Sequence, residues 1–583
     1  MSAPARHWGG HLREGGAHFA LWAPAQARLA LRAGGHDQMM QPHGDGWFTC
    51  TAAGLRAGDA YHFVLEDGRT VPDPAARAQA GDVHGPSKLV DPAGFRWQNP
   101  GWQGRPWAEA VIYELHTGTF TPDGTFRAAI PRLAELADLG VTAIELMPIA
   151  QFPGNRGWGY DGVLPYAVHP AYGHPDDLRA LVDAAHGLGL MVLLDVVYNH
   201  FGPEGNYLPL YAPDFFDPDR HTPWGAGIAW DRAPVRRFFI DNALYWLDEY
   251  RLDGLRLDAI DQIADASQPD ILTELAQAVR TRFDREVHLT TEDNRNITRL
   301  HERKGDRVPL YTAEWNDDWH NAAHVIATNE TAGYYRDFAD NPHAHLARAM
   351  AEGFAWQGEV SPGTGAPRGQ ASAHLPPAAF VDFLQNHDQT GNRALGERID
   401  ALADPRAVRA LRAMLLLSPH VPLLFMGEEY GETRPFLFFT DFQGDLAEAV
   451  RQGRRREFAQ FGFDAQAIPD PNDPETFVAS KLGWSRRTNA GAGALAWMRS
   501  LLAVRAREVT PHLGRAGGHA GRVLASAPAV VAVEWALDGA ALAVLANLSD
   551  RPAPAPPAGG RAIWGEEGEG LGPWQVRARK AAP

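Results

Sequence analysis

Short apolar runs alternate with amphipathic stretches through the middle of the chain. Eight runs rich in Val, Leu, Ile and Met predict buried strands, at residues 111–115, 143–147, 191–197, 254–258, 287–292, 310–314, 380–384 and 423–426. Between them, Phe126–Leu139 carries apolar residues at helical spacing, and residues 175–188 and 235–250 follow the same pattern. Strands that alternate with helices are typical of parallel sheets joined by crossover helices. Eight such units predict an α/β fold, the (β/α)8 TIM barrel.

Shorter strand-like runs flank the predicted barrel on both sides. The runs before it are separated by Gly, Pro and Asp turns and predict a small N-terminal β-sandwich, at residues 18–23, 28–32, 46–49 and 61–65. Residues 71–100, rich in Pro, Asp and Gly, are predicted to be a connector on the surface. The runs after the barrel predict a C-terminal β domain with a Pro-rich loop at 552–557, and they lie at residues 523–525, 529–535 and 541–548. The predicted domains are 1–95 (sandwich), 96–490 (barrel with loop insertions) and 491–583 (C-terminal β domain).

Two segments are longer than a barrel needs. Residues 198–230 are irregular and aromatic, which predicts a loop subdomain over the face where the strands end. Residues 315–379 are predicted to be a second insertion that is partly helical.

The composition, 45% hydrophobic and 21% charged, is that of an ordinary folded protein. The formal net charge of −17 disfavours binding to nucleic acid or to anionic membranes, which depends on Lys and Arg. The single cysteine, Cys50, excludes an intrachain disulfide and a cysteine-rich metal site. No apolar leader segment begins the chain, and Arg412, Pro419 and Pro422 interrupt its most apolar long stretch, 411–426. We therefore expect a cytoplasmic monomer or homodimer that contacts neither nucleic acid nor membrane and binds a neutral partner.

Ionisable and amide side chains lie at the ends of four predicted strands. They are Asp195, Asn199 and His200 at the third strand, Arg256 and Asp258 at the fourth, Glu292 at the fifth, and Asn386, His387 and Asp388 after the seventh. A lone acidic residue at a strand end is usually a helix cap or a loop anchor. Because the strand ends of a TIM barrel meet at one mouth, where catalytic residues come from several strands, these side chains are expected to converge.

Asp258 and Glu292 fit the requirements of a retaining glycoside hydrolase, which needs a nucleophilic carboxylate and a protonated acid about 5 to 5.5 Å apart. Neighbouring strands lie about 4.8 Å apart, so carboxyl groups at their ends can meet that requirement. Arg256, on the same strand face as Asp258, is expected to keep the nucleophile ionised. Glu292 is expected to carry a proton, which requires a pKa raised by burial and by other carboxylates. Asp388 is placed to hold sugar hydroxyls and to stabilise the distorted ring.

Glu314 is the alternative candidate for the acid. It ends the sixth predicted strand, two strands away from Asp258, and that separation approaches the range of inverting enzymes. We therefore favour Glu292 and expect Glu314 at the rim, near the polar and aromatic cluster 315–320, where it would bind substrate further out.

Four segments together resemble the ordered signature segments of the alpha-amylase superfamily: 195–200, 254–259, the strand-terminal Glu292 and 386–388. The resemblance implies Asp258 as nucleophile, Glu292 as acid/base and Asp388 as transition-state stabiliser. It also implies that Tyr160 stacks beneath the sugar in the cleaved subsite. The full set of substrate-binding residues taken from these motifs is Tyr160, Asp161, His200, Arg256, Asp261, His387, Trp315 and Asp317.

Within the superfamily, residues 114–120, 148–156, 199–207 and 315–320 resemble the maltooligosyltrehalose trehalohydrolase family. That resemblance implies a glycosidase that takes maltooligosyltrehalose as its substrate, cleaves the α-1,4 bond to the terminal trehalose and releases trehalose. Two departures stand out. Asp261 and Gln262 follow the nucleophile where ordinary amylases continue toward a Lys-His pair that contacts the leaving-group sugar, and Glu314 stands where related trehalohydrolases are expected to carry an amide.

Three other functions stay open at this point. Glycogen branching and debranching enzymes share the layout of a sandwich followed by a barrel. A barrel that had lost catalysis would be a non-catalytic glycan-binding protein, although intact carboxylates at all three catalytic positions argue against it. No cofactor and no metal are expected, because the mechanism requires neither and the chain shows no His-rich ligand spacing.

Overall fold

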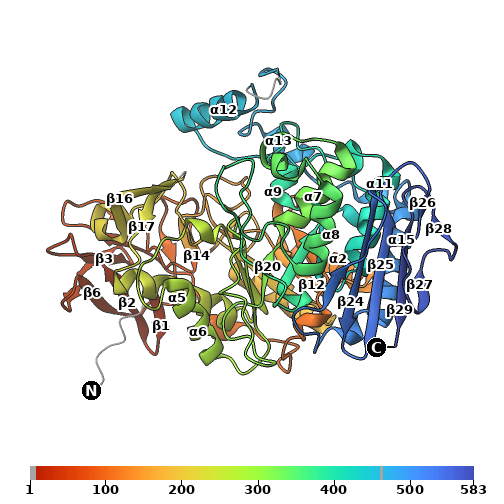
Figure 1. Ribbon diagram of the computed structural model, residues 1–583. Helices are drawn as coiled ribbons and strands as arrows, with labels where there is room; N and C mark the ends of the chain where they lie inside the picture. Colours follow the sequence, from red (N-terminus) through yellow and green to blue (C-terminus); the bar gives the residue numbers. More distant parts are fainter. Residues whose placement is uncertain (1–7, 223, 460–463, 583) are drawn as a thin grey trace.

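Three regions follow one another along the chain in the computed structural model, which describes residues 8–222, 224–459 and 464–582 (Figure 1). Short antiparallel strands come first, a closed barrel of parallel strands forms the centre, and an antiparallel sheet comes last. This arrangement confirms the predicted α/β barrel with β-rich regions before and after it.

Eight parallel strands close the barrel in the order of the sequence. They are β11 (Ile112–Leu115), β12 (Ala143–Leu146), β15 (Met191–Val196), β18 (Gly254–Leu257), β19 (His288–Thr291), β20 (Ala313–Trp315), β21 (Phe380–Phe383) and β22 (Val421–Phe425). Each of them overlaps a strand predicted from the sequence.

Helices lie around the outside of the barrel, and the contacts between them include α2 with α3, α5 with α6, α7 with α11, α11 with α15 and α15 with α2. They are α2 (Phe126–Leu139), α3 (Pro175–Gly187), α5 (Ala233–Glu249), α6 (Ile271–Arg282), α7 (Asp317–Thr328), α11 (Pro405–Leu417) and α15 (Ala492–Glu508). The bounds of α2 are those predicted: Thr125 caps its first turn by accepting a hydrogen bond from Ala128 N, and Gly140, at φ 107°, ends it. The fifth crossover differs from the prediction, because residues 292–312 are all described and form turns without a helix.

The inside of the barrel is apolar at one end and charged at the other. Alternate residues of a strand point inward. The apolar end is a buried cluster that includes Ile112, Ala143, Met191, Leu193, Ala313, Trp315, Val381, Phe383, Val421 and Leu423. Two residues further along three of these strands, the inward positions hold Glu114, Glu145 and Asp195, all of them buried. The barrel therefore presents its charges at the carboxyl ends of the strands.

The N-terminal region consists of two antiparallel sheets, with strand orders β1-β2-β6-β5 and β4-β3-β7-β10-β9, and β8 pairs with β7. Their strands are β1 (Gly9–Arg13), β2 (Gly16–Trp22), β3 (Ala30–Ala33), β4 (His36–Met39), β5 (Gln41–Pro42), β6 (Trp47–Ala53), β7 (Ala60–Val64), β8 (Thr70–Val71), β9 (Ala78–Gln79) and β10 (Ser87–Lys88). The prediction of a surface connector over residues 71–100 was wrong in its first part, because β9 and β10 complete the second sheet. A strand of two residues is too short to show the alternation of apolar and polar residues by which a strand is predicted from sequence.

The first insertion, residues 198–230, contains a β-hairpin as well as irregular segments. Its elements are α4 (Leu208–Tyr211), η3 (Pro213–Phe215), β16 (Phe216–Thr222) and β17 (Gly225–Ile228), and the last two pair with each other. The second insertion is partly helical, as predicted, with α7, η5 (Gly333–Phe338) and α8 (Pro342–Glu352).

The C-terminal sheet has the strand order β23-β24-β25-β29-β27 and packs against α8 and α11. Its strands are β23 (Gly521–Val523), β24 (Val530–Leu537), β25 (Ala540–Asn547), β27 (Arg561–Trp564) and β29 (Val576–Ala581), and a small pair, β26 (Ala553–Pro554) with β28 (Gly570–Leu571), lies beside it. The domain limits stay a prediction. Because α15 packs against α2 and α11, its contacts favour grouping it with the barrel.

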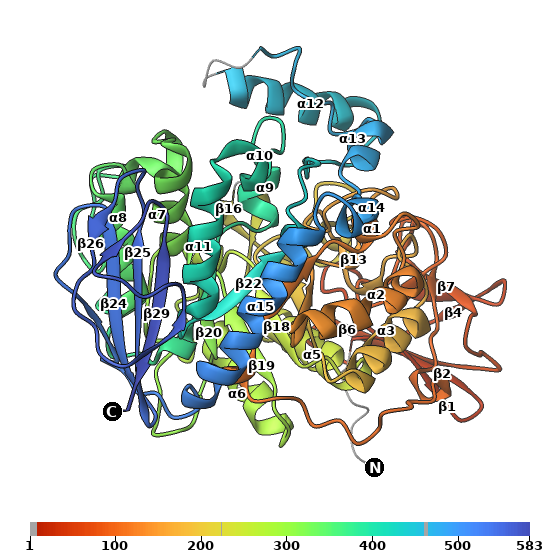
Figure 2. The same ribbon diagram turned by 90° about the vertical axis from the view of Figure 1, so that its right-hand side faces the viewer.

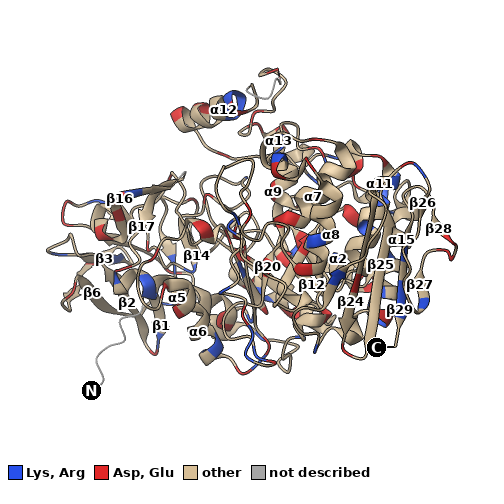
Figure 3. Cartoon of the chain, viewed as in Figure 1, with Lys and Arg blue, Asp and Glu red and all other residues tan. Residues whose placement is uncertain are grey.

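Two views agree that α12 (Gly444–Ala459) projects from the body of the protein (Figures 1 and 2). Acidic and basic residues are interspersed along all three regions (Figure 3). Among the described residues, no helix combines the length and apolar character needed to cross a membrane. No cluster of three or more His, Cys, Asp or Glu in that same part of the chain is arranged to hold a metal ion.

The buried guanidinium of Arg505 fixes α15 to the end of α11. It is 1% exposed and donates to the carbonyl oxygens of Leu416 (3.1 Å), Ser418 (2.5 Å) and His420 (2.7 Å). The R505A variant would leave these three acceptors without their donor, which should lower the free energy of unfolding by about 3 kcal/mol or more. Calorimetry should show a lower unfolding temperature.

The matched control is R507A on the same helix. The Arg507 side chain is 64% exposed, and its partner Glu508, which is 7% exposed, also pairs with Arg561 and Lys580 and would keep them in the variant. Exposed ion pairs contribute roughly 0 to 1 kcal/mol, so this variant should melt close to the wild type. Equal unfolding temperatures for R505A and R507A would contradict the anchoring role of Arg505.

Candidate active site

The guanidinium of Arg256 lies at the centre of the charged end of the barrel. Its Nη1 is 2.7 Å from Asp195 Oδ2 and 2.8 Å from Asp258 Oδ1, and its Nη2 is 2.6 Å from Glu292 Oε2. Trp315 lies against the same group, with its ring centre 4.3 Å from Cζ. The two carboxyl groups predicted to form the catalytic pair therefore lie on the two arms of one guanidinium.

The backbone after β18 helps to set the position of this pair. Ala259 follows Asp258 in the left-handed region, at φ 39°, a conformation that a residue with a side chain adopts only under local constraint. In that turn the N–H of Ala259 donates to Glu292 Oε2 (3.2 Å). Asn199 donates to Asp258 Oδ2 (3.1 Å) from the end of β15. Three strand ends thus fix the two carboxyl groups.

Burial raises the pKa of the Glu292 carboxyl well above its usual range. Arg256 opposes this shift, whereas Asp258, Asp317 and Asp388 add to it through their negative charges. Glu292 therefore holds a proton at pH values where an ordinary glutamic acid is ionised, as an acid catalyst must.

Asp388 lies at the start of the short helix α9 (His387–Gly391), next to the catalytic pair. Asn386 caps this helix by accepting from the N–H of Asp388 (2.9 Å), and Asn392 donates to Asp388 Oδ1 (2.6 Å). Burial raises the pKa of Asp388; His387 opposes the shift and Asp258 adds to it. The charge of Asp258 acts on the pKa of Asp388, and the charge of Asp388 acts on the pKa of Glu292, so Asp388 lies in the same charged cluster as both.

Asp317, at the start of α7, belongs to this cluster as well. Burial and the charge of Asp388 raise its pKa to about 7. Its Oδ1 accepts a hydrogen bond from Gln389 Nε2 (2.9 Å), which links α7 to α9. The structure thus brings the predicted Asp317 beside Asp388.

Tyr160 and His387 form a stacked pair on one side of the site. Their ring centres are 5.1 Å apart and their planes differ by 20°. The Tyr160 hydroxyl donates to Asp195 Oδ2 (2.6 Å) and lies 2.8 Å from His387 Nε2. Gly159, at φ 101°, permits the preceding turn, because a Cβ there would lie 2.1 Å from the carbonyl oxygen of Pro148.

His200 lies beside the Tyr160 backbone, with its Nε2 3.0 Å from the Tyr160 carbonyl oxygen. Burial lowers the pKa of His200, although Asp258 opposes the shift. The indole of Trp224, on the β16–β17 hairpin, stacks on the imidazole with ring centres 4.7 Å apart and planes 18° apart.

The three remaining predicted residues lie around this centre. Asp161 directly follows Tyr160, and burial raises its pKa to about 6. Asp261 lies in η4 (Ile260–Gln262) after the nucleophile, where its Oδ2 accepts from Gln262 Nε2 (2.7 Å). Trp315 is only 2% exposed beneath Arg256, so it lies under the site rather than along its surface.

The predicted position of Glu314 at the rim was wrong. It is 1% exposed, and its Oε2 accepts from Thr291 Oγ1 (2.6 Å) and lies 3.3 Å from His301 Nε2. Strand β20 continues to Trp315, whose indole points into the barrel, so the side chain of Glu314 points outward. Its carboxyl group is on the opposite face of the barrel wall from Glu292.

Two exposed aromatic residues at the site were missed by the sequence analysis. Trp224 is 47% exposed and Tyr334, on η5, is 89% exposed. The Tyr334 phenol interacts with the charges of Asp388 and Asp317, which places it near the catalytic cluster. The aromatic content of the first insertion was the only sequence feature that pointed to Trp224 as a site residue. Sequence does not distinguish an exposed aromatic ring from one in the core.

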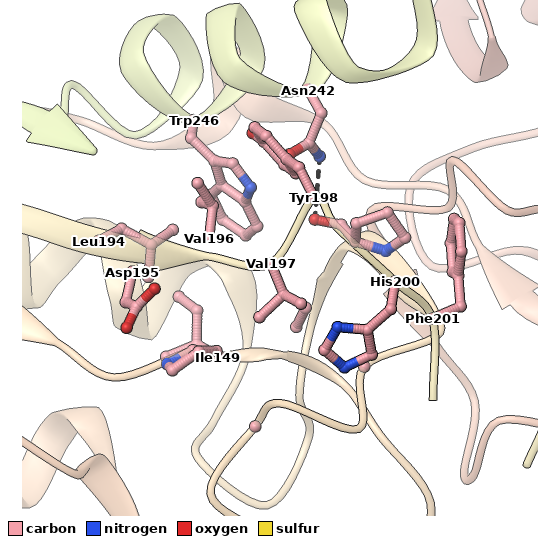
Figure 4. Close-up of a pocket in the computed structure, with 15 residues that line it drawn as sticks. Ile149, Leu194, Asp195, Val196, Val197, Tyr198, His200, Phe201, Asn242 and Trp246 are labelled. Atoms are coloured by element: carbon pink, nitrogen blue, oxygen red, sulfur yellow. Dashed lines mark hydrogen bonds between the residues drawn. The ribbon is translucent and has the colours of Figure 1, made fainter. Parts of the chain in front are cut away.

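A pocket between β15 and α5 lies behind the charged centre (Figure 4). Its lining is mostly apolar and includes Ile149, Leu194, Val196, Tyr198, Phe201 and Trp246. The Tyr198 hydroxyl donates to Asn242 Oδ1 (2.7 Å). Asn242 Nδ2 in turn donates to the carbonyl oxygen of Pro165 (2.9 Å), the bond drawn in Figure 4. Asp195 and His200 also line this pocket. Its other lining residues are mostly apolar, unlike those of the charged cluster around Arg256.

The chain is similar to known proteins over most of its length. Residues 89–209 and 225–498 match the family model described as the alpha amylase catalytic domain, and residues 518–583 match a domain of unknown function (DUF3459). Malto-oligosyltrehalose trehalohydrolase from Deinococcus radiodurans is 43% identical over 502 residues, covering 85% of this chain and 82% of that protein. The protein of that name from Saccharolobus solfataricus is 41% identical over 503 residues, covering 85% and 86%.

Solved structures show the same architecture. The crystal structure of a candidate alpha amylase from Salmonella typhimurium is 56% identical, has a TM-score of 0.97, and covers 99% of this chain and 100% of that one. A pullulanase from Paenibacillus barengoltzii shares the fold at 19% identity, with a TM-score of 0.74 and coverage of 100% and 96%. The chain therefore belongs to the alpha-amylase family of glycosidases and, within it, to the malto-oligosyltrehalose trehalohydrolases.

Proposed function

We propose that this protein hydrolyses the α-1,4 bond between a maltooligosyl chain and a terminal trehalose, with retention of configuration, and releases trehalose. The observation that carries the proposal is the position of Asp258 and Glu292 on the two arms of Arg256. A retaining glycosidase needs one carboxylate as nucleophile and one protonated carboxyl as acid, close together. Relatives at 41 and 43% identity bear the name of the trehalose-releasing enzyme.

In the first step, Asp258 attacks the anomeric carbon of the maltooligosyl chain. Glu292 gives its proton to the glycosidic oxygen at the same time, so trehalose leaves as a neutral alcohol. The bond to the glycosidic oxygen breaks and a covalent ester to Asp258 forms. Arg256, in contact with both groups, stabilises the nucleophile as an anion before the attack.

In the second step, Glu292 is a carboxylate and accepts a proton from a water molecule. The water oxygen attacks the anomeric carbon, the ester to Asp258 breaks, and the maltooligosaccharide is released. Two inversions at the same carbon give net retention, and both side chains return to their starting protonation states.

The remaining residues have supporting roles in the proposal. Asp388 and the stacked pair of Tyr160 and His387 bind the sugar in the cleaved subsite, with His200 beside them. Asp161, Asp261 and Asp317 bind substrate hydroxyls further out, and Asp261 is on the leaving-group side. Trp315 supports Arg256 from below instead of contacting sugar, and the exposed Trp224 and Tyr334 offer rings on which sugars can stack.

We also infer a cytoplasmic location, with the protein acting as a monomer or homodimer on a neutral glycan. A chain with one cysteine has no need of an oxidising compartment. The net charge of −17 gives no advantage in binding anionic partners.

Product analysis tests the proposed function. Incubation with maltooligosyltrehalose should yield trehalose and a shortened maltooligosaccharide, whereas a plain maltooligosaccharide of equal length should be cut far more slowly. Chromatography resolves these products. New α-1,6 branches would instead indicate a branching enzyme, and linear chains released from a branched glucan would indicate a debranching enzyme.

Substitution of the acid tests the assignment of roles. E292Q keeps the shape of the side chain but removes its proton, so kcat/KM should fall by about 100- to 10,000-fold. D258A should abolish nearly all turnover. E314Q is the matched control and should keep most of the activity, because Glu314 points away from the site. An inactive E314Q beside an active E292Q would reverse the assignment.

The pH dependence of kcat/KM tests the protonation of Glu292. Activity requires the protonated acid, and its pKa is raised, so activity should persist well above the ordinary glutamic acid range of about 4.3 and then fall on the alkaline side. D317N removes a negative charge that raises this pKa, so the alkaline limb should move to lower pH. If the alkaline limb of the pH profile did not move in D317N, the charge of Asp317 would not be a cause of the raised Glu292 pKa.

A further inference from the structure

Glu114 is a buried carboxylate that no step of the proposed mechanism uses. It lies on β11, points into the barrel and is 1% exposed. Its Oε1 accepts a hydrogen bond from His387 Nδ1 (2.5 Å), and its Oε2 accepts one from the backbone N–H of the same residue (2.9 Å). One carboxylate therefore fixes both the ring and the backbone of the residue that directly precedes Asp388.

The hydrogen bonds around this ring require His387 to be a cation. The Tyr160 hydroxyl has one proton, which it donates to Asp195 (2.6 Å). Its oxygen must then accept from Nε2 of His387, at 2.8 Å. Because Nδ1 donates to Glu114, both ring nitrogens carry protons, and the ring is an imidazolium.

We propose that Glu114 is a positioning residue of the active centre: it holds His387 as a cation and, through His387, fixes the Tyr160 ring on which the sugar lies. The chain of contacts runs from Glu114 through His387, Tyr160 and Asp195 to Arg256, and so reaches the catalytic pair. The effect on catalysis rests on the proposed function, whereas the effect on His387 does not.

The electrostatics around His387 agree with this geometry. Burial lowers the pKa of His387, but the charge and hydrogen bond of Glu114 outweigh burial and raise the pKa to about 9. Asp388 contributes in the same direction and Arg256 opposes it. The other titratable groups that face this ring are Tyr160, Asp195, Glu145 and His116. Among them all, Glu114 is the carboxylate bonded to the ring, so its charge should matter most.

The neighbouring strand offers a matched control. Glu145 on β12 pairs with Glu114 across the strand register, and it is also 1% exposed. Within the described residues, neither of its carboxyl oxygens has a hydrogen-bond partner, and burial raises its pKa well above the usual range. E145Q therefore exchanges one neutral group for another of similar shape, whereas E114Q removes a charge.

Kinetics with maltooligosyltrehalose should separate the two variants. Near neutral pH, E114Q should lose about 10- to 100-fold in kcat/KM, the effect expected for the loss of one charged hydrogen bond. E145Q should stay close to the wild type. Part of the E114Q defect should recover at about pH 5.5, because protonation restores the imidazolium without Glu114. A purely structural defect would not recover on acidification.

A titration that needs no substrate tests the cause directly. In protein labelled with 13C in the histidine rings, the His387 signal is the one missing from H387Q. In the wild type it should titrate near about 9, and in E114Q below neutral pH, at least about two pH units lower. In E114D, which keeps the negative charge but moves it away from the ring, the His387 signal should titrate between these two values. E114D also serves as the test if E114Q does not fold.

The outcomes distinguish the two proposals. A wild-type enzyme that releases no trehalose would overturn the proposed function but leave the titration test valid. An unchanged His387 titration in both Glu114 variants would overturn the positioning role, whatever the activity. An equal loss of kcat/KM in E145Q and E114Q would also overturn it, because the defect would then come from disturbed packing.

Discussion

One buried cation, Arg256, organises the centre of this protein. A charged group that leaves water is stable in a protein interior only if it is paired and hydrogen-bonded. Arg256 meets that condition with carboxyl groups from three strands, of which Asp258 and Glu292 are the proposed catalytic pair. The guanidinium is planar and its donor directions are fixed, so it dictates where those carboxyl groups stand. The proposed nucleophile and acid are therefore aligned by one rigid group instead of by two independent loops.

The alternation of side chains along each strand decides which acidic residues can reach that cation. Arg256 points into the barrel and Asp258, two residues later, points the same way. Glu314 cannot reach Arg256, because its position in the strand is shifted by one residue. Strand β20 continues to Trp315, which places the indole inside the barrel and the Glu314 carboxyl outside it. Position at a strand end is thus insufficient for a catalytic role, since a shift of one residue moves a side chain through the barrel wall.

The features that could be predicted from the sequence depend on local periodicity. All barrel strands and the bounds of α2 follow from apolar spacing, and Asp258 and Glu292 follow from the strands that precede them. Features set by tertiary contacts could not be predicted: β9 and β10 are too short to show alternation, and the missing fifth helix leaves only turn-rich sequence. The direction of Glu314 and the exposure of Trp224 depend on neighbours distant in sequence. The domain limits and the roles of individual site residues stay predictions.

Charge balance at the barrel mouth explains which acid retains a proton. Arg256 and His387 lie among a larger number of carboxyl groups, which are Glu114, Glu145, Asp195, Asp258, Glu292, Asp317 and Asp388. Arg368 and Arg454 add positive charge near Asp317 and Asp388, but the carboxyl groups still outnumber the cations. If all of them ionised, uncompensated negative charge would accumulate in a poorly solvated space, so the pKa of several must rise. Glu145, which has no hydrogen-bond partner in the described part of the chain, holds its proton deep in the barrel, where it is 1% exposed. The side chain of Glu292 is 14% exposed and can pass its proton to a substrate. In the proposed mechanism, the proton of the general acid therefore comes from the excess of carboxyl groups over cations, and the assignment of Glu292 as that acid rests on its partial exposure.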